Sequence, residues 1–217
     1  IAGVNGIDSM TFCFNVSITR LGAPNAFPVK IVLDFGTGCT GNDGRIRKGK
    51  VITVYTNRLV IPGAKATTTF DGYAVNGIQV EGTHIIENTS TANNLRFRKQ
   101  VVGAKLTKPN GNYIQWSCDK TLTQTDGLGT PYWPFDDVLE ISGQASGATK
   151  RDNNFFQWSH IISKPLVKKF SCRWLTKGEV TIQRSNRNVG YLDFGNGTCD
   201  NKATVTVNNV TVEITLN

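Results

Sequence analysis

The chain has 217 residues, of which 39% are hydrophobic and 18% are charged, and its formal net charge is +8. This composition is typical of a globular protein, and no apolar run reaches the roughly 18 residues that a membrane-spanning helix needs. The length allows one large all-β domain or two smaller ones. The chain begins at Ile1 rather than Met, so we expect any export signal or lipid anchor to lie upstream of residue 1.

Alternation of apolar and polar residues with a period of two predicts an all-β fold. Because Gly, Asn, Asp or Pro bounds most of these segments, we expect strands at 10–17, 29–35, 46–56, 64–71, 79–87, 94–106, 112–122, 138–145, 154–162, 170–175, 179–184, 203–207 and 210–216. Residues 165–169 are the one segment for which we expect a helical turn. So many strands at short spacing predict an antiparallel meander, folded into a sandwich or a strongly curled sheet.

Two pairs of residues predict tight hairpin turns. Asn76-Gly77 and Asn208-Asn209 each separate two alternating segments and favour positive φ at both central positions. The second turn would oppose Val207 with Val210 and Val205 with Val212, with the valines on one face and the threonines on the other.

A motif occurs twice, as Leu-Asp-Phe-Gly-Thr-Gly-Cys at 33–39 and as Leu-Asp-Phe-Gly-Asn-Gly-Thr-Cys at 192–199. We also match residues 75–83 with 141–149, and 94–115 with 154–183. These echoes predict two related units, 1–130 and 131–217, packed as one body. A repeat of this kind describes architecture and supplies no catalytic group.

Five cysteines in turn-rich β sequence, without a Cys-x-x-Cys motif, favour disulfides in an oxidising compartment. Two disulfides among five cysteines allow about fifteen pairing schemes, and the sequence alone does not choose among them. The scheme that we prefer pairs Cys13 with Cys39 and Cys172 with Cys199, because each pair would link a strand to a copy of the repeated motif. Cys118 is then left as a buried, inert thiol.

Catalytic signatures are sparse. The only histidines are His84 and His160, and neither belongs to a nucleophile elbow or a metalloprotease motif. A polysaccharide hydrolase is the alternative function, with its acid and base drawn from Asp136, Asp137 and Glu140, which adjoin an aromatic cluster. Adjacent acids on a strand point to opposite faces, which argues against this pair. We expect no cofactor and no enzyme activity.

Oxygen-rich glycine turns are the best metal candidates. Asp34 and Asp43 lie in the first copy of the motif, and Asp193 and Asp200 in the second. They could contribute to a calcium site, but neither stretch has the spacing of an EF-hand loop. We therefore assign no metal.

Ligand binding is the remaining possibility. Positive charges are spread along alternating strands without a nucleic-acid-binding motif, so we expect no nucleic-acid partner. Trp133, next to Tyr132 in an expected loop, is the best candidate for an exposed platform that stacks on a sugar ring.

Several stretches resemble a family of exported lipoproteins common in Bacteroidetes. They are 32–39 with Asp43-Gly44-Arg45 and Lys48-Gly49-Lys50, and 171–174 through 197–205. The resemblance covers most of the chain from about residue 29. It implies export to the periplasm or the outer-membrane surface and a lipid-anchored precursor, and it transfers no functional residues.

We therefore expect a non-enzymatic cell-envelope β scaffold that binds a glycan or a surface protein. Membrane attachment would come only through the upstream lipid anchor.

Overall fold

The computed structural model describes residues 13–23, 26–92, 94–130 and 132–217. Within these ranges the chain forms fourteen strands and one short 3-10 helix, η1 (Pro134–Asp136). The strands are β1 (Asn15–Arg20), β2 (Val29–Asp34), β3 (Cys39–Thr40), β4 (Ile46–Tyr55), β5 (Lys65–Val75), β6 (Ile78–Asn88), β7 (Arg96–Thr107), β8 (Tyr113–Asp126), β9 (Val138–Arg151), β10 (Asn154–Lys169), β11 (Lys177–Arg184), β12 (Gly190–Asn196), β13 (Lys202–Val207) and β14 (Val210–Thr215).

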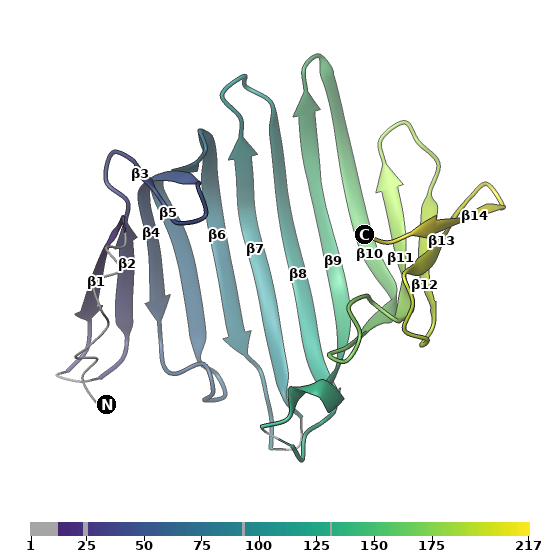
Figure 1. The fold of residues 1–217 in the computed structure, drawn as a ribbon, viewed down its shortest axis with the longest axis horizontal. Helices are drawn as coiled ribbons and strands as arrows, with labels where there is room; N and C mark the ends of the chain where they lie inside the picture. The colour runs from purple at the N-terminus through teal and green to yellow at the C-terminus, as the bar shows by residue number, and fades with distance from the viewer. Residues whose placement is uncertain (1–12, 24–25, 93, 131) are drawn as a thin grey trace.

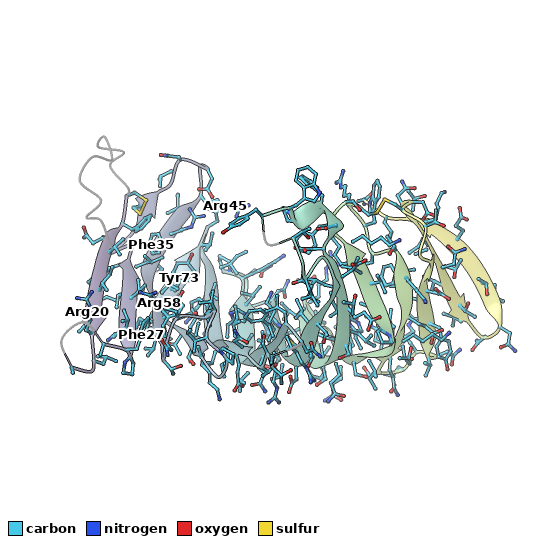
Figure 2. All side chains as sticks on the ribbon, turned by 90° about the horizontal axis from the view of Figure 1, so that it is seen from below. Arg20, Phe27, Phe35, Arg45, Arg58 and Tyr73 are labelled. Carbon is cyan, nitrogen blue, oxygen red and sulfur yellow. A yellow bond between two sulfur atoms is a disulfide. The ribbon has the colours of Figure 1, made fainter. Side chains whose placement is uncertain are left out.

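All fourteen strands belong to one antiparallel sheet, in which chain neighbours are also sheet neighbours (Figure 1). The short strand β3 is the exception, because it pairs only with β4 and lies off the main path. The sheet is open, and it is curved when seen along its strands (Figure 2). The prediction of an all-β antiparallel meander is confirmed.

Residues 10–12 of the strand expected at 10–17 lie outside the described residues. Three other local expectations were wrong. Residues 165–169 continue β10 instead of forming a helical turn, and residues 170–175 form turns instead of a strand. The irregular pairing of β10 around Pro165 breaks the period-two pattern, which explains the first error. Strand β12 was not expected, because its sequence was interpreted only as a turn motif.

Both predicted hairpin turns are present. Asn208 and Asn209 have φ values of 51° and 63°, and Asn76 and Gly77 have 48° and 79°. Val207 pairs with Val210 and Val205 with Val212, as the alternation predicted.

The repeat places an equivalent hairpin near each end of the sheet. Asn15 pairs with Asp34 in the first copy, as Glu179 pairs with Asp193 in the second. The register therefore aligns β1, Asn-Val-Ser-Ile-Thr-Arg, with residues 179–184, Glu-Val-Thr-Ile-Gln-Arg. The other matched stretches are not equivalent, since Asn76-Gly77 is a hairpin turn whereas Ser142-Gly143 lies inside β9.

The boundary expected between residues 130 and 131 falls in the loop that joins β8 to β9. These two strands pair from Tyr113–Lys150 to Asp126–Val138, so the sheet is continuous across the expected boundary.

Paired residues lie on the same face of an antiparallel sheet, so the register defines two faces. The apolar face carries most of the large aliphatic side chains, such as Leu33, Val51, Leu122, Ile182 and Val205. The polar face carries mainly Thr, Ser, Gln and charged residues.

Because the strands form a single layer, much of both faces meets solvent. The accessible surface is 14169 Å², whereas a compact monomer of 23.7 kDa exposes roughly 9,800 Å². Fully buried residues are few and small, and two end clusters account for several of them. At one end, Phe35 packs between Phe14 and Tyr73 (Figure 2). At the other end, Cys172 and Thr176 are both buried, and the Thr176 carbonyl accepts a hydrogen bond from the N–H of Gly197.

Candidate functional site

The cysteine pairing predicted from the repeat is confirmed. Cys13 bonds to Cys39 and Cys172 bonds to Cys199, and Cys118 is free. Each disulfide links the segment before a hairpin to the end of the repeated Asp-Phe-Gly motif. Two disulfides indicate folding in an oxidising compartment outside the cytoplasm. In the ranges that the structure describes, no helix is long and apolar enough to cross a membrane.

The four carboxylates considered as calcium ligands are each hydrogen-bonded to a residue close to them in sequence. Asp34, Asp193 and Asp200 each accept a hydrogen bond from the backbone N–H two residues later. Asp43 accepts hydrogen bonds of 2.9 and 2.7 Å from the Arg47 guanidinium, which holds the pKa of this carboxyl well below its usual range. Over the described ranges, no three His, Cys, Asp or Glu side chains come together as a metal site.

The histidines lie on the apolar face, in the same cross-strand row as Cys118. The row runs His84, Val101, Cys118, Ala145 and His160 across β6 to β10. Cys118 is half-buried rather than fully buried as expected, and each histidine lies two strands away from it, which is roughly 10 Å. Burial lowers the pKa of both histidines, and nearby lysines add to the shift.

The aromatic loop between β8 and β9 is exposed, as predicted. Tyr132 is 96% exposed and Trp133 is 60% exposed. The Trp133 ring meets the edge of Phe135 at a centroid distance of 5.3 Å. Three aromatic rings therefore lie close in sequence in the loop that joins the ends of β8 and β9, in the middle of the strand order (Figure 1).

The acids beside this loop are bound to separate neighbours. Thr130 donates a 2.7 Å hydrogen bond to Asp136, and Gln124 donates a 2.8 Å bond to Asp137. Glu140 is exposed on β9. These contacts explain how the loop is held and supply no proton-transfer partner for the carboxylates.

The most distinctive surface was not predicted, and it lies on the polar face of β8 to β11. Gln-x-Ser occurs once in each of these four successive strands or at its end: Gln115-Trp-Ser117, Gln144-Ala-Ser146, Gln157-Trp-Ser159 and Gln183-Arg-Ser185. Residues two apart on a strand share a face. We call these eight side chains the Gln–Ser groove.

Cross-strand pairing gives the groove its shape. Ser117 pairs with Ser146, which pairs with Ser159, so three short side chains form a row across neighbouring strands. Longer glutamines flank the row on both sides, with Gln115 and Gln157 on one side and Gln144 on the other. The row crosses the strands at intervals of about 4.8 Å.

Three hollows meet at Ser146. The largest, about 590 Å³, is lined by Gln115, Gln157, Ser159 and Gln183 among others. A second, about 370 Å³, lies between Val102 and Ile161. A third, about 300 Å³, adjoins Ser117. Together they form a continuous depression across the polar face.

The hydrogen-bonding groups of the groove are largely unused. Within the described part of the chain, the side chains of Gln115, Gln144, Gln157 and Gln183 make no hydrogen bond, nor do the hydroxyls of Ser146 and Ser159. Amides and hydroxyls both donate and accept. The groove therefore offers paired donors and acceptors to a ligand.

The eight side chains of the groove are uncharged, but two charged residues border it. Lys105, the cross-strand partner of Gln115, lines the third hollow, and Asp119, the partner of Gln144, lines the second. Beyond the groove, Asp34 pairs with Lys50, and Lys202 with Glu213. The nearest charged pair, Arg98 with Asp119, is closed on itself by hydrogen bonds.

The groove and the aromatic loop are separate sites. Ser117 and Asp126 are nine residues apart on β8, which corresponds to roughly 30 Å along the strand. The serines have no histidine to activate them, because both histidines lie on the opposite face. Serine hydroxyls without a neighbouring base are better suited to hydrogen-bonding a ligand than to nucleophilic catalysis.

The geometry defines an open, disulfide-stapled, single-sheet β protein with a neutral hydrogen-bonding groove. Comparison with protein-family models, curated proteins and solved structures finds no match to the chain.

Proposed function

We propose that this protein is a non-enzymatic cell-envelope scaffold that binds an uncharged glycan in the Gln–Ser groove. The observation that carries the proposal is the fourfold Gln-x-Ser pattern, aligned by the register into one depression with unused donors and acceptors. Glycans present many hydroxyls, each of which can donate and accept a hydrogen bond.

The proposal includes export, as a periplasmic or surface lipoprotein. The two disulfides support an oxidising compartment, and the Bacteroidetes resemblance suggests the lipid anchor. An anchored scaffold that binds a polysaccharide needs a rigid exposed surface, which a wide antiparallel sheet supplies.

The hydrolase alternative has less support. It needs two carboxylates on either side of a cleft, whereas Asp136 and Asp137 are bonded to different neighbours. None of the three joined hollows is lined by these acids.

The test is titration calorimetry with a panel of soluble polysaccharides: neutral β-glucan, mannan and xylan, and acidic polygalacturonate. We expect binding to a neutral polymer, in low and moderate salt alike. The double variant Gln144→Ala/Gln157→Ala should weaken it by at least about tenfold, since each lost hydrogen bond costs about 1 kcal/mol.

Two controls separate the sites. Gln79→Ala removes an exposed amide from β6, on the same face but outside the groove, and should change nothing. Trp133→Ala tests the aromatic loop. If only Trp133→Ala abolishes glycan binding, the binding site is the aromatic loop and not the groove. If the protein binds only polygalacturonate, and salt abolishes that binding, the interaction is explained by net charge alone.

A further inference from the structure

The last strand of the sheet, β14, has an unprotected outer edge. It lies at one end of the sheet and, within the described residues, pairs only with β13 (Figure 1). Val210 is 64% exposed and Val212 is 56% exposed. Proline, inward charges and bulges, which protect many edge strands, are absent from β14, and its one charged side chain, Glu213, is paired with Lys202 of the same chain.

In the first copy of the repeat, the strand equivalent to β14 is β5, which has a paired strand on its outer edge. The register that aligns the two hairpins also aligns β14 with β5, because Val51 pairs with Phe70 as Val205 pairs with Val212. The outer edge of β5 carries β6. Among the described residues, no strand pairs with the equivalent edge of β14.

The direction of the strands determines which copy can pair. The main path holds thirteen alternating strands, so β1 and β14 run in the same direction. A copy placed head to tail would meet β14 in parallel. A copy related by a two-fold axis brings β14 against itself in the antiparallel sense and closes the assembly as a dimer.

The sequence of β14 is complementary to itself in one register. The two-residue turn directs the backbone groups of Val210 and Val212 toward β13, and those of Thr211 and Glu213 outward. An axis at Val212 pairs Thr211 with Glu213 of the partner subunit, and Val210 with Ile214 of the partner subunit. The valines and isoleucine then stay together on the apolar face.

The two neighbouring registers are less favourable. An axis at Thr211 would overlap only residues 210–212 of the two strands, because β14 begins at Val210. An axis at Glu213 would set two carboxylates directly opposite each other, which is destabilising. With the axis at Val212, Glu213 meets a threonine and keeps its 2.9 Å ion pair with Lys202 of its own chain.

We propose that β14 pairs with β14 of a second copy, in the register centred on Val212, and so joins two sheets into one. Because the axis is perpendicular to the joined sheet, both Gln–Ser grooves lie on the same face. The proposal does not depend on what the grooves bind.

The test is sedimentation equilibrium of the purified chain over a wide range of concentration. We expect a monomer–dimer equilibrium in the parent. Val212→Lys places two ammonium groups opposite each other at the axis and should weaken dimerisation by at least about tenfold. Val16→Lys, on the other edge strand with 53% exposure, is the matched control and should leave it unchanged.

A second pair of variants tests the register, and circular dichroism establishes that each variant is folded. Thr211→Glu puts a carboxylate opposite Glu213 of the partner subunit and should weaken the dimer, whereas Thr211→Glu/Glu213→Lys should restore it. A parent that is monomeric at every concentration would overturn the proposal. So would a dimer that Val212→Lys leaves intact, because the contact would then lie elsewhere.

Discussion

Asn88 at the end of β6 is the most informative site for testing what stabilises this sheet. It is 1% exposed, and its Nδ2 donates a 2.7 Å hydrogen bond to the carbonyl of Leu59. Its Oδ1 accepts a 2.9 Å bond from the N–H of Ser90. One side chain thus joins the β4–β5 loop to the loop that follows β6.

The variant Asn88→Ala removes both hydrogen bonds and leaves two backbone groups without partners. Each unsatisfied buried group costs about 1–3 kcal/mol, and partial access of water reduces the sum. We therefore expect the free energy of unfolding to fall by about 2–4 kcal/mol, measured by urea denaturation followed by circular dichroism.

Asn88→Asp gives a sharper test, because it keeps the shape. The new carboxylate would face the Leu59 carbonyl and repel it, so we expect a loss at neutral pH that is at least as large. Acidification should recover part of this loss, since a protonated carboxyl can donate to that carbonyl. The exposed Asn57→Ala is the control and should change stability by less than about 0.5 kcal/mol. If Asn88→Ala lies within that limit too, the assigned role of the buried amide is wrong.

Two further predictions concern the apolar face and the middle of the sheet. Burial beside Lys99 lowers the pKa of His84 below its usual 6.5, so the unfolded chain binds this proton more readily. The free energy of unfolding should therefore fall as pH decreases from above 6.5 toward the folded-state pKa, and His84→Gln should flatten this part of a stability–pH series. Gly147→Ala would bring a methyl group against the backbone of β8 and to 2.7 Å from the Trp158 ring; a loss of about 1–3 kcal/mol is expected in urea melts. Gly129→Ala, with no atom within 4 Å of the added carbon, should show no such loss.

Much of the fold could be predicted because its signals are local. Asn208-Asn209 specifies its turn through backbone conformation, and the adjoining alternation then sets the register. The disulfides followed from the repeated motif, since Cys13 and Cys172 hold equivalent places before equivalent hairpins. The helical turn expected at 165–169 failed because a bulge in β10 disrupts the alternation.

The sequence could not predict that the sheet forms a single layer, because this depends on whether a second layer covers its apolar face. An alternating strand has the same pattern whether its apolar side meets another sheet or solvent. The Gln–Ser groove illustrates a related limit. Its tripeptides are visible in the sequence, but only the pairing of Ser117, Ser146 and Ser159 shows that they form one row.

The location of the groove follows from how the sheet is stabilised. The stapled hairpins lie near the two ends, where Phe35 and Cys172 are buried, so the disulfides and much of the small core are held away from the middle. Strands β8 to β10 are stabilised mainly by long antiparallel pairing, which depends on backbone hydrogen bonds and tolerates many side chains on the polar face. Side chains on the polar face there are therefore less constrained by packing than those at the ends, so this part of the sheet can carry the proposed binding groups without disturbing the small core.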